Sequence, residues 1–169
     1  GERVLDLCAA PGGKTTHLAE LMDDRGEVVA VDLPERIGLV TTAAERLGLS
    51  SIRCVPGDGT QVTFLQPFDA ILVDAPCSNT GVLARRPDAR WRLGPEDIAK
   101  TAELQRRLVR HAATLLAPGG RLLYVTCSLE PEENDVAPVL AGLSLVRRED
   151  VLPTPRSSGA HMSLFRRRS

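Results

Sequence analysis

The sequence predicts a doubly wound α/β fold, in which a mostly parallel sheet is covered by helices on both faces. Two observations predict it. Short apolar runs typical of strands alternate with longer stretches in which apolar residues recur at helical spacing, which indicates repeated βαβ units. The short runs are nearly all apolar, as in residues 70–73, and this is expected for strands buried on both faces.

Five strands are predicted, with three helices among them. The strands are Arg3–Leu7, Glu27–Val31, Ser51–Val55, Asp69–Val73 and Arg121–Val125, and the helices are Lys14–Asp24, Glu35–Leu47 and Pro95–Leu116. If these strands follow the common order 3-2-1-4-5, the fourth and fifth strands are neighbours in the sheet.

Two regions have weaker patterns. The stretch Ala75–Gly94 lacks clear periodicity, and a connection of that length in a compact domain is usually functional or disordered. After residue 127 we predict one more helix over Pro131–Ala141 and short final strands at Ser144–Arg147 and Ser163–Arg166.

Composition limits the number of domains, the kind of partner and the cellular compartment that we expect. The 169 residues suffice for one domain, and 21 basic against 22 acidic residues give no overall attraction to nucleic acid. Four cysteines lie far apart without a CxxC pair, which argues against a zinc site or a disulfide framework and favours the cytoplasm. The apolar runs are too short to cross a bilayer. Because Arg3 already belongs to a predicted core strand, we expect residues 1–169 to be cut from a longer protein.

A turn of small residues follows the first predicted strand. It consists of Cys8, Ala9, Ala10, Pro11, Gly12, Gly13 and Lys14. Such a turn lets the backbone approach a ligand, and the freed amides and the positive end of the next helix favour a carboxylate or phosphate. Asp32 ends the second strand, where it can accept hydrogen bonds from ribose hydroxyls, and Asp58 follows the third, placed to meet an adenine edge. Together they suit a nucleoside-bearing ligand.

Three ligands compete for this site. Residues 13–15 resemble the end of a phosphate-binding P-loop, but Cys8 stands where that loop requires glycine. A dinucleotide is disfavoured because the turn lacks GxGxxG spacing. S-adenosylmethionine needs one turn and one helix terminus and no pyrophosphate cradle, so it fits best. Each residue taken singly also has a structural explanation, since the glycines can make the turn and Asp32 can cap a helix.

Two further motifs end the fourth and fifth strands, at residues 74–77 and 126–128. In open parallel sheets, ligands bind outside the carboxyl ends of the strands, near the point where strand order reverses. Asp74, Cys77 and Cys127 should therefore converge beside the methyl group of the cofactor. A lone cysteine at a strand end is usually a small buried apolar residue, but two of them beside an aspartate indicate chemistry.

These motifs resemble the signatures of the RNA cytosine-5 methyltransferase family, most closely the Sun/Fmu type that acts on small-subunit ribosomal RNA. The matching segments are residues 8–14, 74–78 and 124–128, with further matches at 86–88, Trp91 and 130–134. The resemblance covers nearly the whole chain. It implies a Rossmann-like, S-adenosylmethionine-dependent methyltransferase domain over residues 1–169, with the family's RNA-binding modules in an amino-terminal part outside them.

The resemblance also implies a role for each site residue. Residues 8–14, Asp32, Asp58 and Asp74 would line the S-adenosylmethionine site, Cys127 would be the nucleophile, and Cys77 would help to release the product. Carbon 5 of cytosine is too weak a nucleophile unaided, so a thiolate must first add to carbon 6. Asp74 would hydrogen-bond the pyrimidine edge, and the cytosine would leave any stack to reach the pocket.

The chain departs from the family pattern in two places. Asn79 stands where a small residue is common, and we expect it to alter the pocket wall slightly. The region around 161–163 lacks the usual Asp-Gly-Phe-Phe stretch, which leaves the pairing of the last strand open. The loop 83–92 carries four arginines and Trp91. Either these contact phosphates and stack on a base, or Trp91 anchors the loop to the core and the arginines are solvated.

Two other classes of protein stay open. An amino-group methyltransferase would prefer an Asn/Asp-Pro-Pro-aromatic motif where this chain has residues 74–77. A module that binds cofactor or RNA without turnover is disfavoured by the presence of both Cys77 and Cys127. The expected partner is RNA, ribosomal before transfer RNA, and we expect neither a metal nor a membrane.

Overall fold

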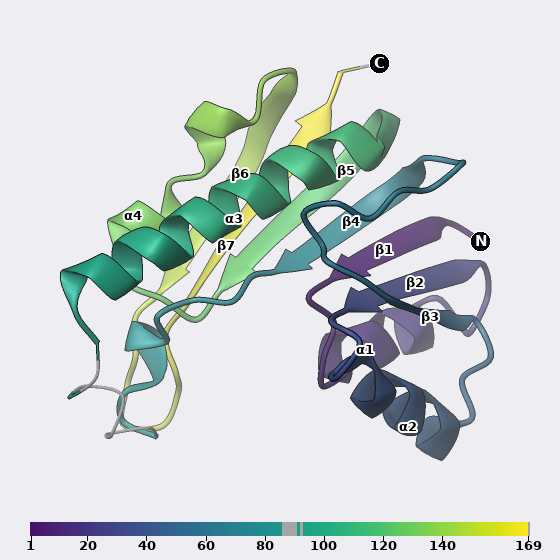
Figure 1. The fold of residues 1–169 in the computed structure, drawn as a ribbon, viewed down its shortest axis with the longest axis horizontal. Helices are drawn as coiled ribbons and strands as arrows, with labels where there is room; N and C mark the ends of the chain where they lie inside the picture. The colour runs from purple at the N-terminus through teal and green to yellow at the C-terminus, as the bar shows by residue number, and fades with distance from the viewer. Residues whose placement is uncertain (86–90, 92, 169) are drawn as a thin grey trace.

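The computed structural model describes residues 1–85, 91 and 93–168, and it contains one seven-stranded sheet in the order β3-β2-β1-β4-β5-β7-β6 (Figure 1). The strands are β1 (Arg3–Leu7), β2 (Glu27–Asp32), β3 (Ile52–Pro56), β4 (Phe68–Asp74), β5 (Leu116–Thr126), β6 (Leu143–Val151) and β7 (Ala160–Arg167). The longer helices are α1 (Gly13–Leu21), α2 (Ile37–Leu47) and α3 (Pro95–Leu115).

The first five strands run parallel, and their order confirms the predicted 3-2-1-4-5 arrangement. β4 and β5 are neighbours, with Val73 opposite Tyr124 and Asp74 opposite Val125. The carboxyl ends of β1, β4 and β5 therefore open at the same edge of the sheet. This edge carries the motifs that the sequence singled out.

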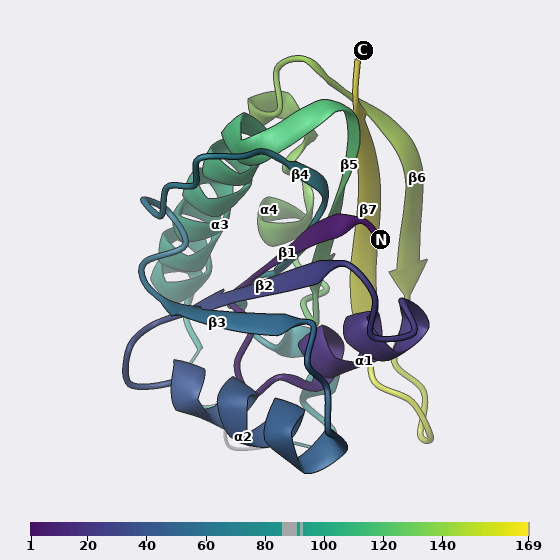
Figure 2. The ribbon, with the colours of Figure 1, turned by 90° about the vertical axis from the view of Figure 1, so that its right-hand side faces the viewer.

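Helices cover both faces of the sheet, as predicted. α3 lies on one side, and α1 and α2 lie on the other (Figure 2). On β2, Val29 and Val31 pack into the larger core with Leu108 of α3, whereas Ala30 between them packs with Val40 of α2. This alternation explains why the central strands are apolar at every position, since both of their faces are buried.

The prediction of a helix over Pro131–Ala141 is wrong. One short helix, α4 (Pro131–Asn134), is followed by a 3-10 turn, η3 (Ala137–Val139). Asp135 leaves the helical region with φ −93° and ψ 79°, and Pro138 has no backbone N–H and disfavours helical geometry at the residue before it. The chain therefore leaves the helix at Asp135 and, after η3, which still packs on α3, returns to the sheet as β6.

The two final strands are longer than the predicted Ser144–Arg147 and Ser163–Arg166. β7 inserts between β5 and β6 and runs antiparallel to both, with Thr126 opposite His161. β6 is the edge strand, and its mostly exposed side chains give it no clear apolar period. The described part of the connection over Ala75–Gly94 includes a 3-10 turn, η1 (Thr80–Val82).

The other differences lie at element ends. α1 stops at Leu21, before the predicted Asp24, because Asp23 and Asp24 have a left-handed φ of 53°. β5 begins at Leu116, ahead of the predicted Arg121. Within the described residues, no helix is both long enough and apolar enough to span a bilayer.

Candidate active site

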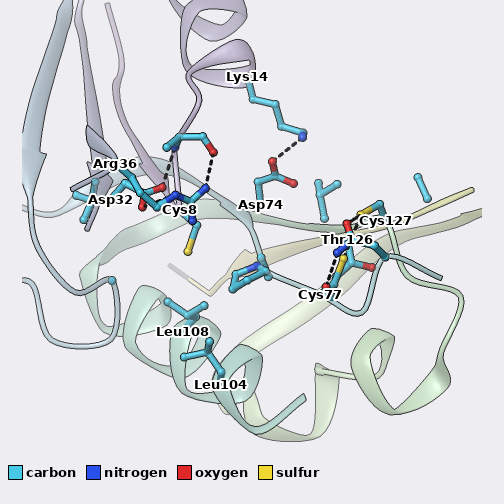
Figure 3. A pocket seen from close by; sticks show the side chains of 18 of the residues that line it. Cys8, Lys14, Asp32, Arg36, Asp74, Cys77, Leu104, Leu108, Thr126 and Cys127 are labelled. Atoms are coloured by element: carbon cyan, nitrogen blue, oxygen red, sulfur yellow. Dashed lines mark hydrogen bonds and ion pairs between the residues drawn. The ribbon is translucent and has the colours of Figure 1, made fainter. Parts of the chain in front are cut away.

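A cavity of about 820 Å³ opens at the carboxyl edge of the sheet (Figure 3). Eight of the predicted site residues line it: Cys8, Ala10, Lys14, Asp32, Asp58, Asp74, Cys77 and Cys127. They come from the ends of β1, β2, β4 and β5, from the start of α1 and from the turn after β3. The cavity also has apolar walls, which include Leu33, Leu104 and Leu108.

The other four residues of the predicted turn do not line the cavity but shape it: Ala9, Pro11, Gly12 and Gly13. Ala9 donates its backbone N–H to Val31 O at 3.0 Å, which ties the turn to β2. Gly12 has a φ of 106°, and a Cβ on it would lie 3.1 Å from Val40 Cα. This glycine therefore lets the turn pack directly on α2.

Asp32 braces the first turn from the end of β2. Its side chain is buried, with Oδ2 accepting the N–H of Ala10 at 2.8 Å and Oδ1 accepting the N–H of Leu33 at 2.8 Å. Because each carboxylate oxygen has a second lone pair, Asp32 retains capacity for hydroxyl donors from a ligand. Asp32 does not cap a helix, because α2 begins after Arg36 without a side-chain cap bond. It supports the first turn instead, and its ligand-binding role stays a prediction.

Asp58 braces the turn after β3. Its Oδ1 accepts both the N–H and the hydroxyl of Thr60 at 2.8 Å, and these bonds lower the pKa of the carboxyl group. The side chain still faces the cavity. Across the cavity, Lys14 Nζ lies 2.6 Å from Asp74 Oδ2 in a partly exposed ion pair.

Two sulfur atoms meet at the far end of the cavity. Cys77 Sγ and Cys127 Sγ are 3.1 Å apart, each on the loop that follows one of the paired strands β4 and β5 (Figure 3). The pKa of the Cys127 thiol is lowered to about 7, first because the Cys77 thiol donates a hydrogen bond to its sulfur. The same interaction, together with burial, raises the pKa of Cys77. The pair therefore favours a thiolate at Cys127 and a thiol at Cys77.

Cys8 also lines the cavity but has the opposite character. Burial raises the pKa of its thiol to about 12, with further contributions from nearby carboxylates. A thiol of this kind is a poor nucleophile near neutral pH. Among the three cysteines of the cavity, Cys127 alone combines partial exposure with a lowered pKa.

A buried glutamate that sequence reasoning did not single out ties the two cysteine loops together. The carboxyl group of Glu133 accepts the N–H of Ser78 at 2.9 Å, the Ser78 hydroxyl, and the side-chain amide of Gln105 at 3.1 Å. Ser78 Oγ in turn lies 3.1 Å from Ser128 Oγ. Residues 78 and 128 each follow a cysteine, so this network fixes both loops to α4.

Asn134 and Tyr124 reinforce this network from the side of β5. Asn134 accepts the hydroxyl of Thr126 at 2.7 Å and donates its amide to Ser128 O at 2.9 Å. The hydroxyl of Tyr124 donates to Glu133 O at 2.7 Å. The residues that flank Cys127 are thus hydrogen-bonded on both sides.

The arginine-rich loop lies only partly within the described residues. Arg85 is exposed, whereas Arg86, Arg90 and Arg92 fall outside the described residues. Trp91 has 86% of its surface exposed, so it does not anchor the loop to the core. Within the described part of the chain, no group of three or more His, Cys, Asp or Glu residues is arranged to hold a metal ion.

Comparison with known proteins identifies the family to which this chain belongs. A protein-family model described as 16S rRNA methyltransferase RsmB/F matches residues 1–161. The probable ribosomal RNA small subunit methyltransferase B of Bacillus subtilis is 46% identical over 138 residues, which cover 79% of this chain and 31% of that protein. The ribosomal RNA small subunit methyltransferase B of Klebsiella pneumoniae is 48% identical, with 79% and 32% covered. The chain thus spans about a third of the length of these curated relatives.

Solved structures of methyltransferases have the same fold as this chain. NSun6 from Pyrococcus horikoshii, crystallised with SFG, has a TM-score of 0.86 and 29% identity, and the match covers 99% of this chain and 48% of that one. A methyltransferase homologue from the same organism has a TM-score of 0.81 and 31% identity, with 99% and 62% covered. The fold is that of the Rossmann-like methyltransferases. Within that class, the chain belongs to the 16S rRNA methyltransferase RsmB/F family.

The lowered pKa of Cys127 predicts its reactivity. Because the thiolate is the reactive form, the alkylation rate at Cys127 should rise with pH and reach half of its maximum near pH 7. Cys77→Ala removes the donor to this thiolate, so the midpoint should move up toward the ordinary value of 9.0. The measurement is iodoacetamide labelling across pH, followed by mass spectrometry of the peptide that contains Cys127. Cys54→Ala, on β3, is the control and should leave the midpoint unchanged; an unchanged midpoint in Cys77→Ala contradicts the donor role.

The buried Glu133 network predicts a large loss of stability. Glu133→Ala leaves the N–H of Ser78 and the amide of Gln105 without this partner, and we expect the free energy of unfolding to fall by roughly 3 to 5 kcal/mol. Urea unfolding measures it. Glu132→Ala, at the exposed neighbouring position, should change the same quantity by less than about 0.5 kcal/mol. Equal losses in the two variants would show that the network does not stabilise the fold.

Proposed function

We propose that this protein transfers a methyl group from S-adenosylmethionine to carbon 5 of a cytosine in RNA, through a covalent bond between Cys127 Sγ and carbon 6. The substrate proposed is 16S ribosomal RNA in the cytoplasm. The observation that carries the proposal is the pair of sulfur atoms, 3.1 Å apart, in the wall of the cavity that also holds the glycine-containing first turn. Membership of the RsmB/F family supports the RNA substrate.

The cavity fits S-adenosylmethionine. Its volume of about 820 Å³ lies in the range of small-molecule sites, and its lining combines apolar side chains with charged and polar ones. Asp32 and Asp58 present carboxylates for ribose hydroxyls and an adenine edge, while Leu33 and Leu108 offer an apolar surface to a ring. The related NSun6 structure contains SFG, an S-adenosylmethionine analogue, which supports the same choice of ligand.

The two cysteines divide the chemistry between them. The thiolate of Cys127 adds to carbon 6, the carbon 5–carbon 6 double bond opens, and carbon 5 becomes able to take a methyl group. S-adenosylmethionine supplies that group from its sulfonium centre. A water molecule then takes the carbon 5 proton, and the electron pair of that C–H bond restores the double bond. The bond between carbon 6 and sulfur breaks with its electron pair leaving on Cys127 Sγ. Cys77 keeps its proton and donates to the Cys127 sulfur, so it stabilises that sulfur as a thiolate both before attack and on departure.

Asp74 and the exposed loop contribute binding. Asp74, at the end of β4, lies between the turn that carries Lys14 and the loop that carries Cys77, where it can hydrogen-bond the edge of a pyrimidine. Trp91 and Arg85 are exposed on the chain segment between Cys77 and α3, where they can stack on a base and contact phosphate.

Cofactor binding tests the first half of the proposal. Asp58→Ala should weaken the binding of S-adenosylmethionine by about tenfold, because a hydrogen bond to a charged group is lost. Isothermal titration calorimetry measures it. Asp24→Ala is a matched control, since Asp24 also braces a turn by accepting backbone and hydroxyl donors, from Ser50 and Ser51, but does not line the cavity. Equal dissociation constants in the two variants would remove Asp58 from the site.

Methylation of a 16S ribosomal RNA transcript tests the second half. Cys127→Ala should abolish turnover because no adduct forms, whereas Cys77→Ala should accumulate a covalent RNA adduct because release of Cys127 slows. Radiolabelled methyl transfer measures turnover, and a denaturing gel detects the adduct. Cys54→Ala is the control and should resemble the unaltered protein.

Other results separate the alternatives. Methyl groups found on an exocyclic amine would replace the proposal with amino-group chemistry. Cofactor binding without any transfer to ribosomal or transfer RNA would indicate a binding module. An adduct that also forms in the Cys77→Ala, Cys127→Ala double variant would assign the nucleophile to another residue.

A further inference from the structure

Asn79 occupies a backbone position that few residue types adopt without strain. It lies in the loop after β4, between Cys77 and η1, with φ 62° and ψ 25°. Among residues other than glycine, asparagine is one of those that tolerate this left-handed conformation best. Its side chain lines the cavity beside the two sulfur atoms.

The two ends of the Asn79 amide group contact the two cysteines. Nδ2 donates to the backbone carbonyl oxygen of Cys77 at 2.7 Å, and Oδ1 accepts from Cys127 Sγ at 2.9 Å. A carbonyl oxygen can only accept, so it fixes which end of the amide faces Cys77. The amide oxygen must then face Cys127, and that sulfur must carry a proton to complete the bond.

Asn79 and Cys77 therefore favour opposite protonation states of Cys127. Cys77 Sγ, 3.1 Å away, donates to the sulfur and favours the thiolate. The oxygen of Asn79 accepts from the sulfur and favours the thiol, because an amide oxygen would repel a thiolate. These two neighbours therefore act in opposite directions on the charge of Cys127.

Other ionisable groups near Cys127 belong to five further elements. Asp74 at the end of β4 opposes ionisation, and Lys14 of α1 favours it. On β7, opposite Thr126, both ring nitrogens of His161 are bonded, to Asp150 of β6 and to Ser163. On α4, the carboxyl group of Glu133 is bonded to Ser78 and Gln105. None of these bonds in the described residues involves the Asn79 amide, so its effect can be varied separately.

We propose that Asn79 is a positioning residue that stabilises the thiol form of Cys127 in the resting pocket, with the S–H directed at Asn79 Oδ1, against the thiolate form that Cys77 favours. The thiolate forms when this hydrogen bond breaks and the proton passes to water in the open cavity. The inference rests on the proposed function only in taking Cys127 as the nucleophile. It makes Asn79 a determinant of when the nucleophile is charged.

Two substitutions at Asn79 test this in opposite directions. Asn79→Gly keeps the left-handed backbone and removes the acceptor, so the midpoint for alkylation of Cys127 should fall by about 0.5 pH unit, which is about a threefold change in thiolate fraction below the midpoint. Asn79→Asp keeps an acceptor and adds a negative charge, so the midpoint should rise by roughly 1 pH unit. Iodoacetamide labelling across pH, read by mass spectrometry at Cys127, gives each midpoint. The midpoint is used because the intrinsic nucleophilicity of a thiolate changes with its pKa.

Controls separate this role from a structural one. Asp23→Gly changes another residue with positive φ, 53°, at the opposite end of the sheet, and should leave the midpoint at its original value. Thermal unfolding reports any loss of fold in each variant. A midpoint in Asn79→Gly that is unchanged or raised, with the fold retained, overturns the proposal, as does a lowered midpoint in Asn79→Asp. The assay needs neither RNA nor methyl transfer, so its result stands apart from the test of the proposed function.

Discussion

The parallel pairing of β4 with β5 is the constraint on which the site depends. Asp74 lies opposite Val125, and the pairing continues one step beyond β4, where Ala75 donates its N–H to Val125 O at 3.0 Å. Both cysteine loops therefore leave the sheet side by side, and this allows their sulfur atoms to come within 3.1 Å of each other. If another strand lay between β4 and β5, the two motifs would still end at this edge, but they would lie too far apart for their side chains to meet.

Strand pairing alone does not fix the loops, and the buried hydrogen bonds of Glu133 and Asn134 complete the task. The buried carboxyl group of Glu133 accepts hydrogen bonds from Ser78 and Gln105, and Asn134 accepts one from Thr126. Because breaking such buried bonds costs free energy, they hold the two loops in place. This explains why a helix of one turn, α4, lies at the base of the pocket. This helix contributes two polar side chains, those of Glu133 and Asn134, and one turn is long enough to place both of them.

Sequence periodicity predicted the five parallel strands, the three long helices and the edge where the motifs meet. It could do so because the burial of a strand or helix face determines which residues along that element are apolar. It failed at residues 131–141, where the function of the segment is a set of contacts to Ser78 and Thr126, far away in the sequence. The same applies to Asn79, which departs from the family pattern but whose partner, Cys127, lies on the loop after β5, 48 residues away in the sequence. Long-range polar contacts leave no period in the sequence, so neither role could be predicted from it.

The cofactor half and the nucleophile half of the cavity are held by different means. Around Asp32 the bonds run to backbone amides, whereas around Cys127 they run between side chains. The ion pair of Lys14 and Asp74 spans the boundary, and because both groups are partly exposed it adds little stability. The ion pair instead positions the carboxylate of Asp74, because Lys14 bonds to Oδ2 and leaves Oδ1 free of this partner. A carboxylate held in this way stays beside both the first turn and the sulfur pair, the position from which it can contact a pyrimidine.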